Sequence, residues 1–155
     1  MDGLIQILVP VALVGCGMAA GGLVISVRGA PLLLSLPDQQ YVPIHQFLVT
    51  RFDPFMPICL LTALFADLVL AFAVDGAGAR VLCGIAAALL LSAATVSLTR
   101  NVPINRWVST LDPHALPANF RQLDRRQRWV RWNVVRMGLT VAALAVNAAA
   151  LGLLL

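Results

Sequence analysis

The sequence contains no lysine and no glutamate, and charged residues make up only 12% of its 155 residues. A soluble domain carries about 25% charged residues, and a chain this short has a large surface for water to solvate. Here 60% of the residues are hydrophobic and the mean hydropathy is +0.88. The shortage of charge therefore excludes a soluble globular domain and indicates a surface that faces lipid.

Several familiar kinds of chemical site are absent as well. Cys16, Cys59 and Cys83 each lie inside an apolar stretch without CxxC or Cys/His spacing, so we expect buried thiols rather than a zinc site or a redox pair. There is no glycine-rich phosphate loop and no Ser-His-Asp or Cys-His arrangement. The net charge of +4 comes without a basic patch beside stacking aromatics, so we expect no nucleic-acid partner.

The sequence does have long apolar stretches, near residues 4–27, 55–74, 81–98 and 134–155. A helix needs about 20 apolar residues to cross the hydrocarbon core of a bilayer. We therefore predict one all-α domain over residues 1–155, an integral membrane four-helix bundle in contact with the lipid bilayer.

The connections between these stretches differ in length and composition. Residues 75–80 form a tight glycine-containing turn, which makes the second and third helices antiparallel neighbours. Residues 28–54 contain several prolines that are expected to break any long helix, with a short interfacial helix near its end. Residues 99–133 are rich in arginine. The 28–54 and 99–136 segments carry ten of the eleven arginines. The positive-inside rule therefore predicts cytoplasmic long connections, with both termini and the 75–80 turn outside. We expect an integral membrane protein of the bacterial inner membrane.

Gly17 and Gly21 form a GxxxG motif in the first apolar stretch. Such small residues let helix backbones approach closely in lipid, either inside one bundle or in a homo-oligomer. Both arrangements are open from the sequence, with packing inside the bundle favoured.

Polar residues inside apolar stretches need a partner or a chemical role. Asp67 lies near the middle of the second stretch. It is interpreted either as a ligand contact or proton acceptor that faces the bundle interior, or as a hydrogen-bonding residue between helices. Arg136, near the start of the fourth stretch, either anchors the helix at the interface, pairs with Asp67 or binds an anionic oxygen.

Amides and aromatic residues gather at the ends of the third and fourth stretches. Asn101 and Asn105 are four residues apart and would share a helical face, with Pro103 between them to bend the chain. They either bind a polar group at the membrane face or tie the helix end to a neighbour. Asn133 shares a face with the tryptophans that begin the fourth helix.

His45 is the histidine with the stronger functional signal, because His114 lies in an exposed Leu-Asp-Pro-His loop. Histidine titrates near neutrality and serves as a base or a metal ligand. A lone histidine is more often a hydrogen-bonding residue, and a metal would need His45 together with carboxylates or amides. No cofactor is otherwise predicted.

The motifs resemble, in their combination and order, those of the anthrone oxygenase-like family of small membrane proteins, most of whose bacterial members are a domain of unknown function. They are Tyr41-x-x-x-His45-Gln46, Phe52-Asp-Pro-Phe-Met-Pro57, Asn101-Val-Pro-Ile-Asn105 and Trp129-x-x-Trp132-Asn133-x-x-Arg136. The resemblance implies a four-helix membrane bundle and, as in the fungal members, oxidation of an anthrone to an anthraquinone by molecular oxygen without a recognised organic cofactor.

The first functional hypothesis is therefore an oxidoreductase that acts on an apolar phenolic, anthrone-like or quinol-like small molecule. Such a reaction needs a base and donors that stabilise an enolate oxygen. The candidate catalytic residues are His45, Asp67, Asn101, Asn105, Asn133 and Arg136, and the candidate substrate-binding residues are Gln46, Trp107 and Trp132. The alternative is a non-catalytic membrane subunit that docks a partner through residues 99–136, and a transporter is a weaker third hypothesis.

Overall fold

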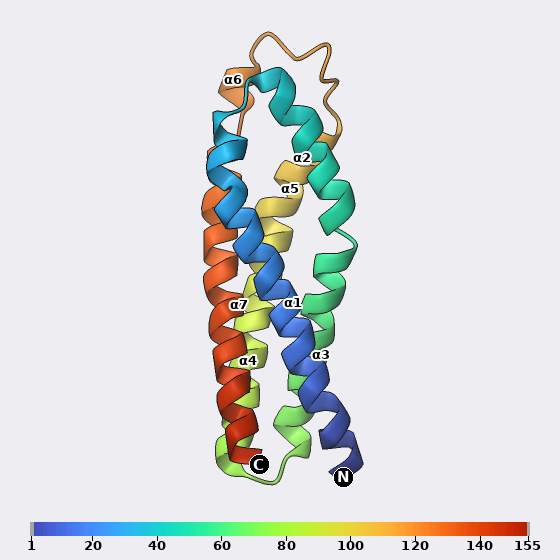
Figure 1. The fold of residues 1–155 in the computed structure, drawn as a ribbon, viewed down its shortest axis with the longest axis vertical. Helices are drawn as coiled ribbons and strands as arrows, with labels where there is room; N and C mark the ends of the chain where they lie inside the picture. The colour runs from blue at the N-terminus through green and yellow to red at the C-terminus, as the bar shows by residue number, and fades with distance from the viewer. Residues whose placement is uncertain (1, 155) are drawn as a thin grey trace.

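The computed structural model describes residues 2–154, which are helical apart from short connections. In chain order the elements are α1 (Asp2–Ser35), α2 (Asp38–Phe52), α3 (Phe55–Ala73), α4 (Ala77–Val96), the π-helix η1 (Ser97–Asn101), α5 (Val102–Ser109), α6 (Phe120–Leu123) and α7 (Arg126–Leu154). They form one elongated bundle (Figure 1). Both ends of the chain and the α3–α4 turn lie at one end, and α2, α6 and the 110–119 connection lie at the other.

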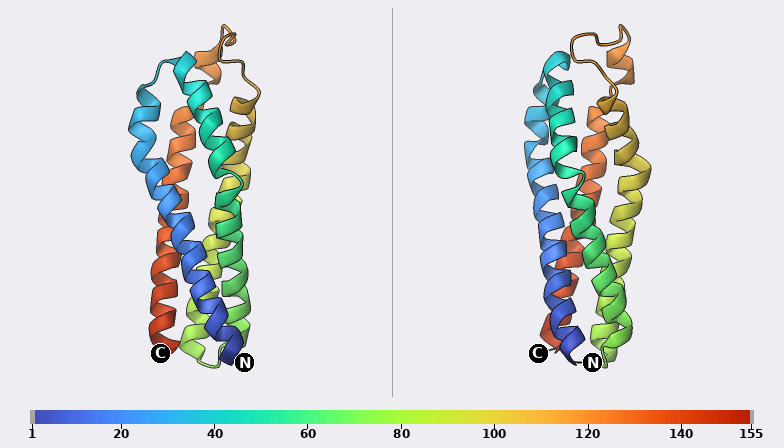
Figure 2. Two further views of the ribbon diagram at one scale, coloured as in Figure 1. Left: turned by 45° about the vertical axis from the view of Figure 1, so that its right-hand side comes forward. Right: turned by 90° about the vertical axis from the view of Figure 1, so that its right-hand side faces the viewer.

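Four continuous or nearly continuous helical runs extend along the bundle, side by side in the two further views (Figure 2). Each is long and apolar enough to cross a membrane: Gly3–Ser35, Asp38–Ala73, Ala77–Ser109 and Phe120–Leu154. The predicted all-α membrane bundle is therefore confirmed. The side of the membrane that each end faces stays a prediction.

The predicted connection over residues 28–54 is wrong in extent. α1 continues through Pro31 to Ser35, and residues 38–52 form α2, so only a short turn separates the two helices. A proline removes one helical hydrogen bond and bends a helix. The helix can still continue through the proline when the ring faces outward and neighbouring helices pack against the other side. Pro31 is exposed in this way. The interfacial helix exists and begins earlier than predicted.

The arginine-rich connection predicted over residues 99–133 is also mostly helical. The third run continues through η1 and α5 to Ser109, and α7 begins at Arg126. Pro103 is accommodated by the wide π turn that precedes it, in which the Val102 N–H donates to the Ser97 carbonyl five residues back. An extra residue in a π turn rotates the following helical face. Asn101 and Asn105, on either side of this proline, are both buried.

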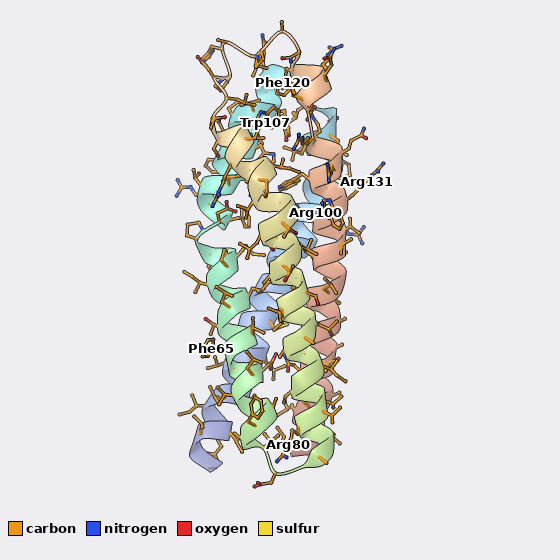
Figure 3. The ribbon with its side chains drawn as sticks, turned by 180° about the vertical axis from the view of Figure 1, so that it is seen from behind. Phe65, Arg80, Arg100, Trp107, Phe120 and Arg131 are labelled. Carbon is orange, nitrogen blue, oxygen red and sulfur yellow. The ribbon has the colours of Figure 1, made fainter. Side chains whose placement is uncertain are left out.

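Exposed arginines mark a level along the bundle. Arg28, Arg51, Arg100 and Arg131 are among the exposed arginines. They lie near one level, because hydrogen bonds join their close neighbours across the bundle: Ser26 to Asn133, Asp53 to Asn105 and Asn101 to Asn133. Arg80 lies near the opposite end. Figure 3 shows Arg100 and Arg131 at a similar height. α1 has 34 residues, a length of about 51 Å, whereas a hydrocarbon core is about 30 Å thick. The bundle therefore extends beyond the hydrocarbon, and the arginines place α5 and α6 on the headgroup side.

Helix packing below this arginine level depends on small residues. A Cβ at Gly15 would lie 2.9 Å from the carbonyl oxygen of Cys59, so the α1 and α3 backbones are in close contact there. A Cβ at Gly17 would meet only Leu144, at 3.9 Å, and Gly21 faces open space. The GxxxG residues are thus not the tight contact within the bundle, and the homo-oligomer through Gly17 and Gly21 stays a prediction.

Candidate functional site

A cavity of about 320 Å³ lies among α1, α2 and α7 near the arginine level. Small-molecule sites are usually clefts of about 300–1,000 Å³ with mostly apolar walls and a few polar groups. The apolar part of the wall consists of Gly22, Leu23, Ile25, Gly29, Leu32, Leu33, Leu36, Ile44, Leu48, Val49, Phe52 and Met56. The polar part consists of Ser26, Asp53, Asn105, Trp129, Asn133 and Arg136.

Asn105 of α5 is the centre of the first hydrogen-bonded group. Its Oδ1 accepts a hydrogen bond from Trp129 Nε1 at 2.8 Å and lies 3.2 Å from His45 Nε2. Its Nδ2 donates to the Asp53 carboxylate, 3.3 Å from Oδ1 and 3.4 Å from Oδ2. Because tryptophan only donates and a carboxylate only accepts, the orientation of the amide is fixed. His45 Nε2 therefore carries a hydrogen and donates it to Asn105.

His45 lies behind Asn105 and is held by aromatic rings. The side chain is fully buried, with the Tyr41 ring edge-on at 5.3 Å and the Trp129 ring at 4.8 Å between centroids. The Arg126 guanidinium covers the other part of this group, 4.0 Å from the Tyr41 ring centroid, and pairs with Asp38 at 2.6 Å. These contacts attach α2 to α7. Because His45 lies behind Asn105, its side chain does not line the cavity.

Asn133 of α7 is the centre of the second group. Its Oδ1 accepts hydrogen bonds from Asn101 Nδ2 at 3.0 Å and from Arg136 Nη1 at 2.9 Å. Its Nδ2 donates to Ser26 Oγ of α1 at 3.3 Å. Asn101 Nδ2 also donates to the backbone carbonyl of Trp129, 3.2 Å away. The sequence-predicted residues Asn101, Asn133 and Arg136 are thus brought together, with Asn133 and Arg136 at the wall of the cavity and Asn101 behind Asn133.

Arg136 has no direct ion pair. Among residues 3–154 the ion pairs within 4.0 Å involve Arg121 and Arg126 and not Arg136, and the Asp53 carboxylate lines the same cavity without such a contact. Arg136 Nε is buried and has no hydrogen-bond partner. A buried guanidinium without a counter-ion is unfavourable, and its fork of donors suits an anionic oxygen. The arrangement can therefore bind and stabilise a negatively charged oxygen inside the cavity.

The predicted pairing of Arg136 with Asp67 is wrong. Asp67 is fully buried and its Oδ2 accepts a hydrogen bond from Asn147 Nδ2 at 3.0 Å. Asn147 follows Arg136 by eleven residues on α7, a rise of about 16 Å, so the two levels are far apart. Asp67 does not line the large cavity. The void beside Asn147 and Cys83 measures about 10 Å³, which is close to the space of a single water molecule.

The three predicted substrate-binding residues make structural contacts outside the cavity lining. Gln46 Nε2 donates to the carbonyls of Val108 and Leu111, each at 2.9 Å, and so ties α2 to the end of α5. Trp107 stacks on Phe120 with centroids 6.0 Å apart, near the top of the bundle in Figure 3. Trp132 is half-buried with the Arg100 guanidinium 5.1 Å from its ring centroid.

Sequence reasoning missed three residues of the polar wall. Asp53 lies between α2 and α3, in a Phe-Asp-Pro segment that was interpreted as part of a connection. Its position directly before an apolar stretch is the signal that was available. Trp129 was noted only as one of the tryptophans that begin the fourth helix, whereas its indole donates to Asn105. Ser26, a single hydroxyl at the end of an apolar stretch, gave no signal.

The described residues do not gather metal ligands at this wall. Among residues 3–154, no group of three or more His, Cys, Asp or Glu side chains is close enough to hold a metal ion. His45 and Asp53 are linked through the Asn105 amide rather than arranged about a common point. The donor set suits an organic ligand with an ionised oxygen.

Comparison with known proteins identifies a family. Residues 47–146 match the sequence profile of the anthrone oxygenase family, which covers more than half of the chain. The matched range contains Asp53, Asn105 and Arg136 and begins two residues after His45. No curated protein and no solved structure matches the chain. The match over most of the bundle shows that this chain belongs to the anthrone oxygenase family.

Proposed function

We propose that the cavity binds an apolar phenolic, anthrone-like or quinol-like molecule and that the protein catalyses its oxidation by molecular oxygen. The observation that carries the proposal is the Arg136 guanidinium, whose buried Nε has no partner at the polar wall of an apolar cavity. Membership of the anthrone oxygenase family makes an anthrone the first substrate class to test.

The chemistry fits the charge of the wall. An anthrone that loses a proton from its methylene carbon becomes an enolate, which is electron-rich and reacts with oxygen. The Arg136 guanidinium would stabilise the negative charge on the enolate oxygen, and the apolar surroundings would strengthen this interaction. Overall, one anthrone and one O₂ give one anthraquinone and one water.

The cavity also suits a substrate that arrives from the bilayer. Ile25 and Leu32 of α1 are 66% and 70% exposed, and Ile44 of α2 is 42% exposed, and all three line the cavity. The cavity therefore opens between α1 and α2 on an apolar side of the bundle, close to the exposed arginines. An aromatic molecule dissolved in lipid would enter through this apolar opening with its oxygen toward Arg136. In the predicted orientation this end of the bundle faces the cytoplasm.

The test is oxygen consumption and anthraquinone formation by protein purified into lipid nanodiscs, with anthrone as substrate and protein-free nanodiscs as the background. We expect the two rates to be equal and well above background. Arg136→Met should lower the rate by about 100- to 1,000-fold, the usual effect of removing an oxyanion donor. Arg131→Met, an exposed arginine on the same helix, is the matched control and should retain activity. A wild-type rate equal to background would contradict the proposal.

A further inference from the structure

The proposed oxidation requires a group that removes a proton from the substrate, and the polar wall narrows the choice. Amide, indole and hydroxyl groups do not act as strong proton acceptors near neutral pH, and a guanidinium is already protonated. Asp53 is the carboxylate among the residues that line the cavity. It faces the same space as Arg136, which would hold the substrate oxygen.

The two bases expected from the sequence are placed less favourably. His45 is fully buried behind Asn105, and its Nε2 donates to the Asn105 amide, so this nitrogen cannot accept a proton from a molecule in the cavity. Asp67 is buried among α1, α3, α4 and α7, where Asn147 is its hydrogen-bond donor. Both side chains are fully buried, and neither borders the cavity.

Asp53 is placed more favourably. It lines the cavity and is exposed where α2 meets α3, near the arginine level, so it can contact a substrate and exchange its proton with water. The Asn105 amide lies 3.3 Å and 3.4 Å from its two oxygens. An ionised carboxylate has about four acceptor positions, so this contact leaves most of them free for a substrate. Because Trp129 fixes the orientation of Asn105, the amide in turn orients the carboxylate.

We propose that Asp53 is the proton acceptor of the reaction, with Asn105 as its positioning residue, an assignment that rests on the proposed oxidation. The Asp53 carboxylate takes one methylene proton, and the electron pair of that C–H bond enters the enolate. The enolate carbon gives two electrons to O₂ as the C–O bond forms, and the proton on Asp53 returns to give a hydroperoxide. Asp53 then takes the second proton from the same carbon while the O–O bond breaks. The carbonyl of the anthraquinone forms, and hydroxide and the proton combine as water.

Proton removal can be measured separately from oxidation, by hydrogen–deuterium exchange at the anthrone methylene in D₂O without oxygen. The wild-type protein in nanodiscs should accelerate this exchange above the protein-free rate. Asp53→Asn should lose the acceleration by about 100-fold or more, the usual contribution of a general base. Asp53→Glu should restore part of it. Asp75→Asn, which removes an exposed aspartate at the other end of the bundle, is the matched control.

The Asp53→Asn variant retains an oxygen that can accept from Asn105, so its fold and its binding of the redox-inert 2-hydroxyanthraquinone should be preserved. If the wild type consumes oxygen and exchanges deuterium, and Asp53→Asn exchanges equally fast, the assignment of Asp53 is overturned and the proposed oxidation stands. If the wild type neither exchanges nor consumes oxygen, the proposed function itself is overturned.

Discussion

Two hydrogen-bonded amides, Asn105 with its partners and Asn147 with Asp67, are both buried between helices. Their surroundings differ. Asn105 lies at the wall of a cavity of about 320 Å³, and the void beside Asn147 measures about 10 Å³. The Arg136 guanidinium at the cavity wall has an Nε without a hydrogen-bond partner, whereas the core near Asp67 is packed with alanine, leucine, valine and cysteine. Buried amides and charged groups therefore have two roles in this bundle. Where the helices pack closely, they join neighbouring helices. Where the helices diverge, they can bind a ligand.

The divergence of the helices has a local cause. α1 and α3 are held together at Gly15, where a Cβ would lie 2.9 Å from the Cys59 carbonyl oxygen, below the arginine level. Above it, α2 is a separate helix that starts anew at Asp38 and is attached to α5 and α7 through Gln46 and Arg126. Small residues thus close one part of the bundle, and long polar side chains hold the other part open around the cavity.

The largest difference in oxidation rate should appear when the amide of Asn105 or of Asn147 is removed. Asn105→Leu leaves the Trp129 indole, His45 and Asp53 without their common partner, and we expect anthrone oxidation to fall by about 100-fold or more. Asn147→Leu is the matched change in the packed part of the bundle and should leave the oxidation rate close to wild type. Steady-state oxygen consumption of both variants measures the contrast. An equal loss of activity in both would remove the distinction between site and packing.

A smaller effect is expected from Gly22→Ala, which narrows the cavity. The added Cβ would lie 2.5 Å from the Met56 sulfur, so the flexible methionine side chain must move, and it lines the cavity. One methylene in an apolar pocket changes specificity by about 10-fold or more, so we expect KM for anthrone to rise by that amount with kcat little changed. Gly21→Ala is the control, because nothing lies within 4 Å of its added Cβ. A KM unchanged by Gly22→Ala would place the substrate elsewhere.

The smallest effect concerns the packed pair and should appear in stability alone. Asn147→Leu leaves Asp67 buried without its donor and should lower the free energy of unfolding by about 1–2 kcal/mol. Adding Asp67→Leu removes the carboxyl group that has lost its donor. The double variant should therefore recover most of the lost unfolding free energy. Equilibrium unfolding in mixed micelles measures the cycle, with oxygen consumption recorded on the same samples. Loss of oxidation in the double variant would return Asp67 to the list of reacting groups.

The architecture was predictable because it depends on the length of apolar stretches and on helical spacing. The four-residue spacing of Asn101 and Asn105 predicted a shared helical face, and both residues are buried. The pairing of Arg136 with Asp67 was predicted from charge alone, without the axial level of either residue. Those levels depend on where each helix begins, and α7 begins at Arg126 rather than near residue 134.

The cavity was beyond prediction from this sequence for a physical reason. Its apolar wall depends on α1 continuing through Pro31 and on α2 lying apart from it, and neither follows from local propensity. Asp53 is part of the site only because that geometry directs the α2–α3 junction toward Asn105. The sequence therefore indicated the amides and Arg136, and the structure added Asp53, Trp129 and Ser26.

The most direct measurement of the central claim compares the affinities of two redox-inert ligands for the purified protein at mildly alkaline pH: 2-hydroxyanthraquinone, which ionises, and 2-methoxyanthraquinone, which does not. If Arg136 binds an ionised oxygen inside the cavity, the wild type should bind the hydroxy compound more tightly by about tenfold or more. In Arg136→Met this preference should disappear, while Arg131→Met keeps it. A preference that is the same in the wild type and in Arg136→Met would contradict the account.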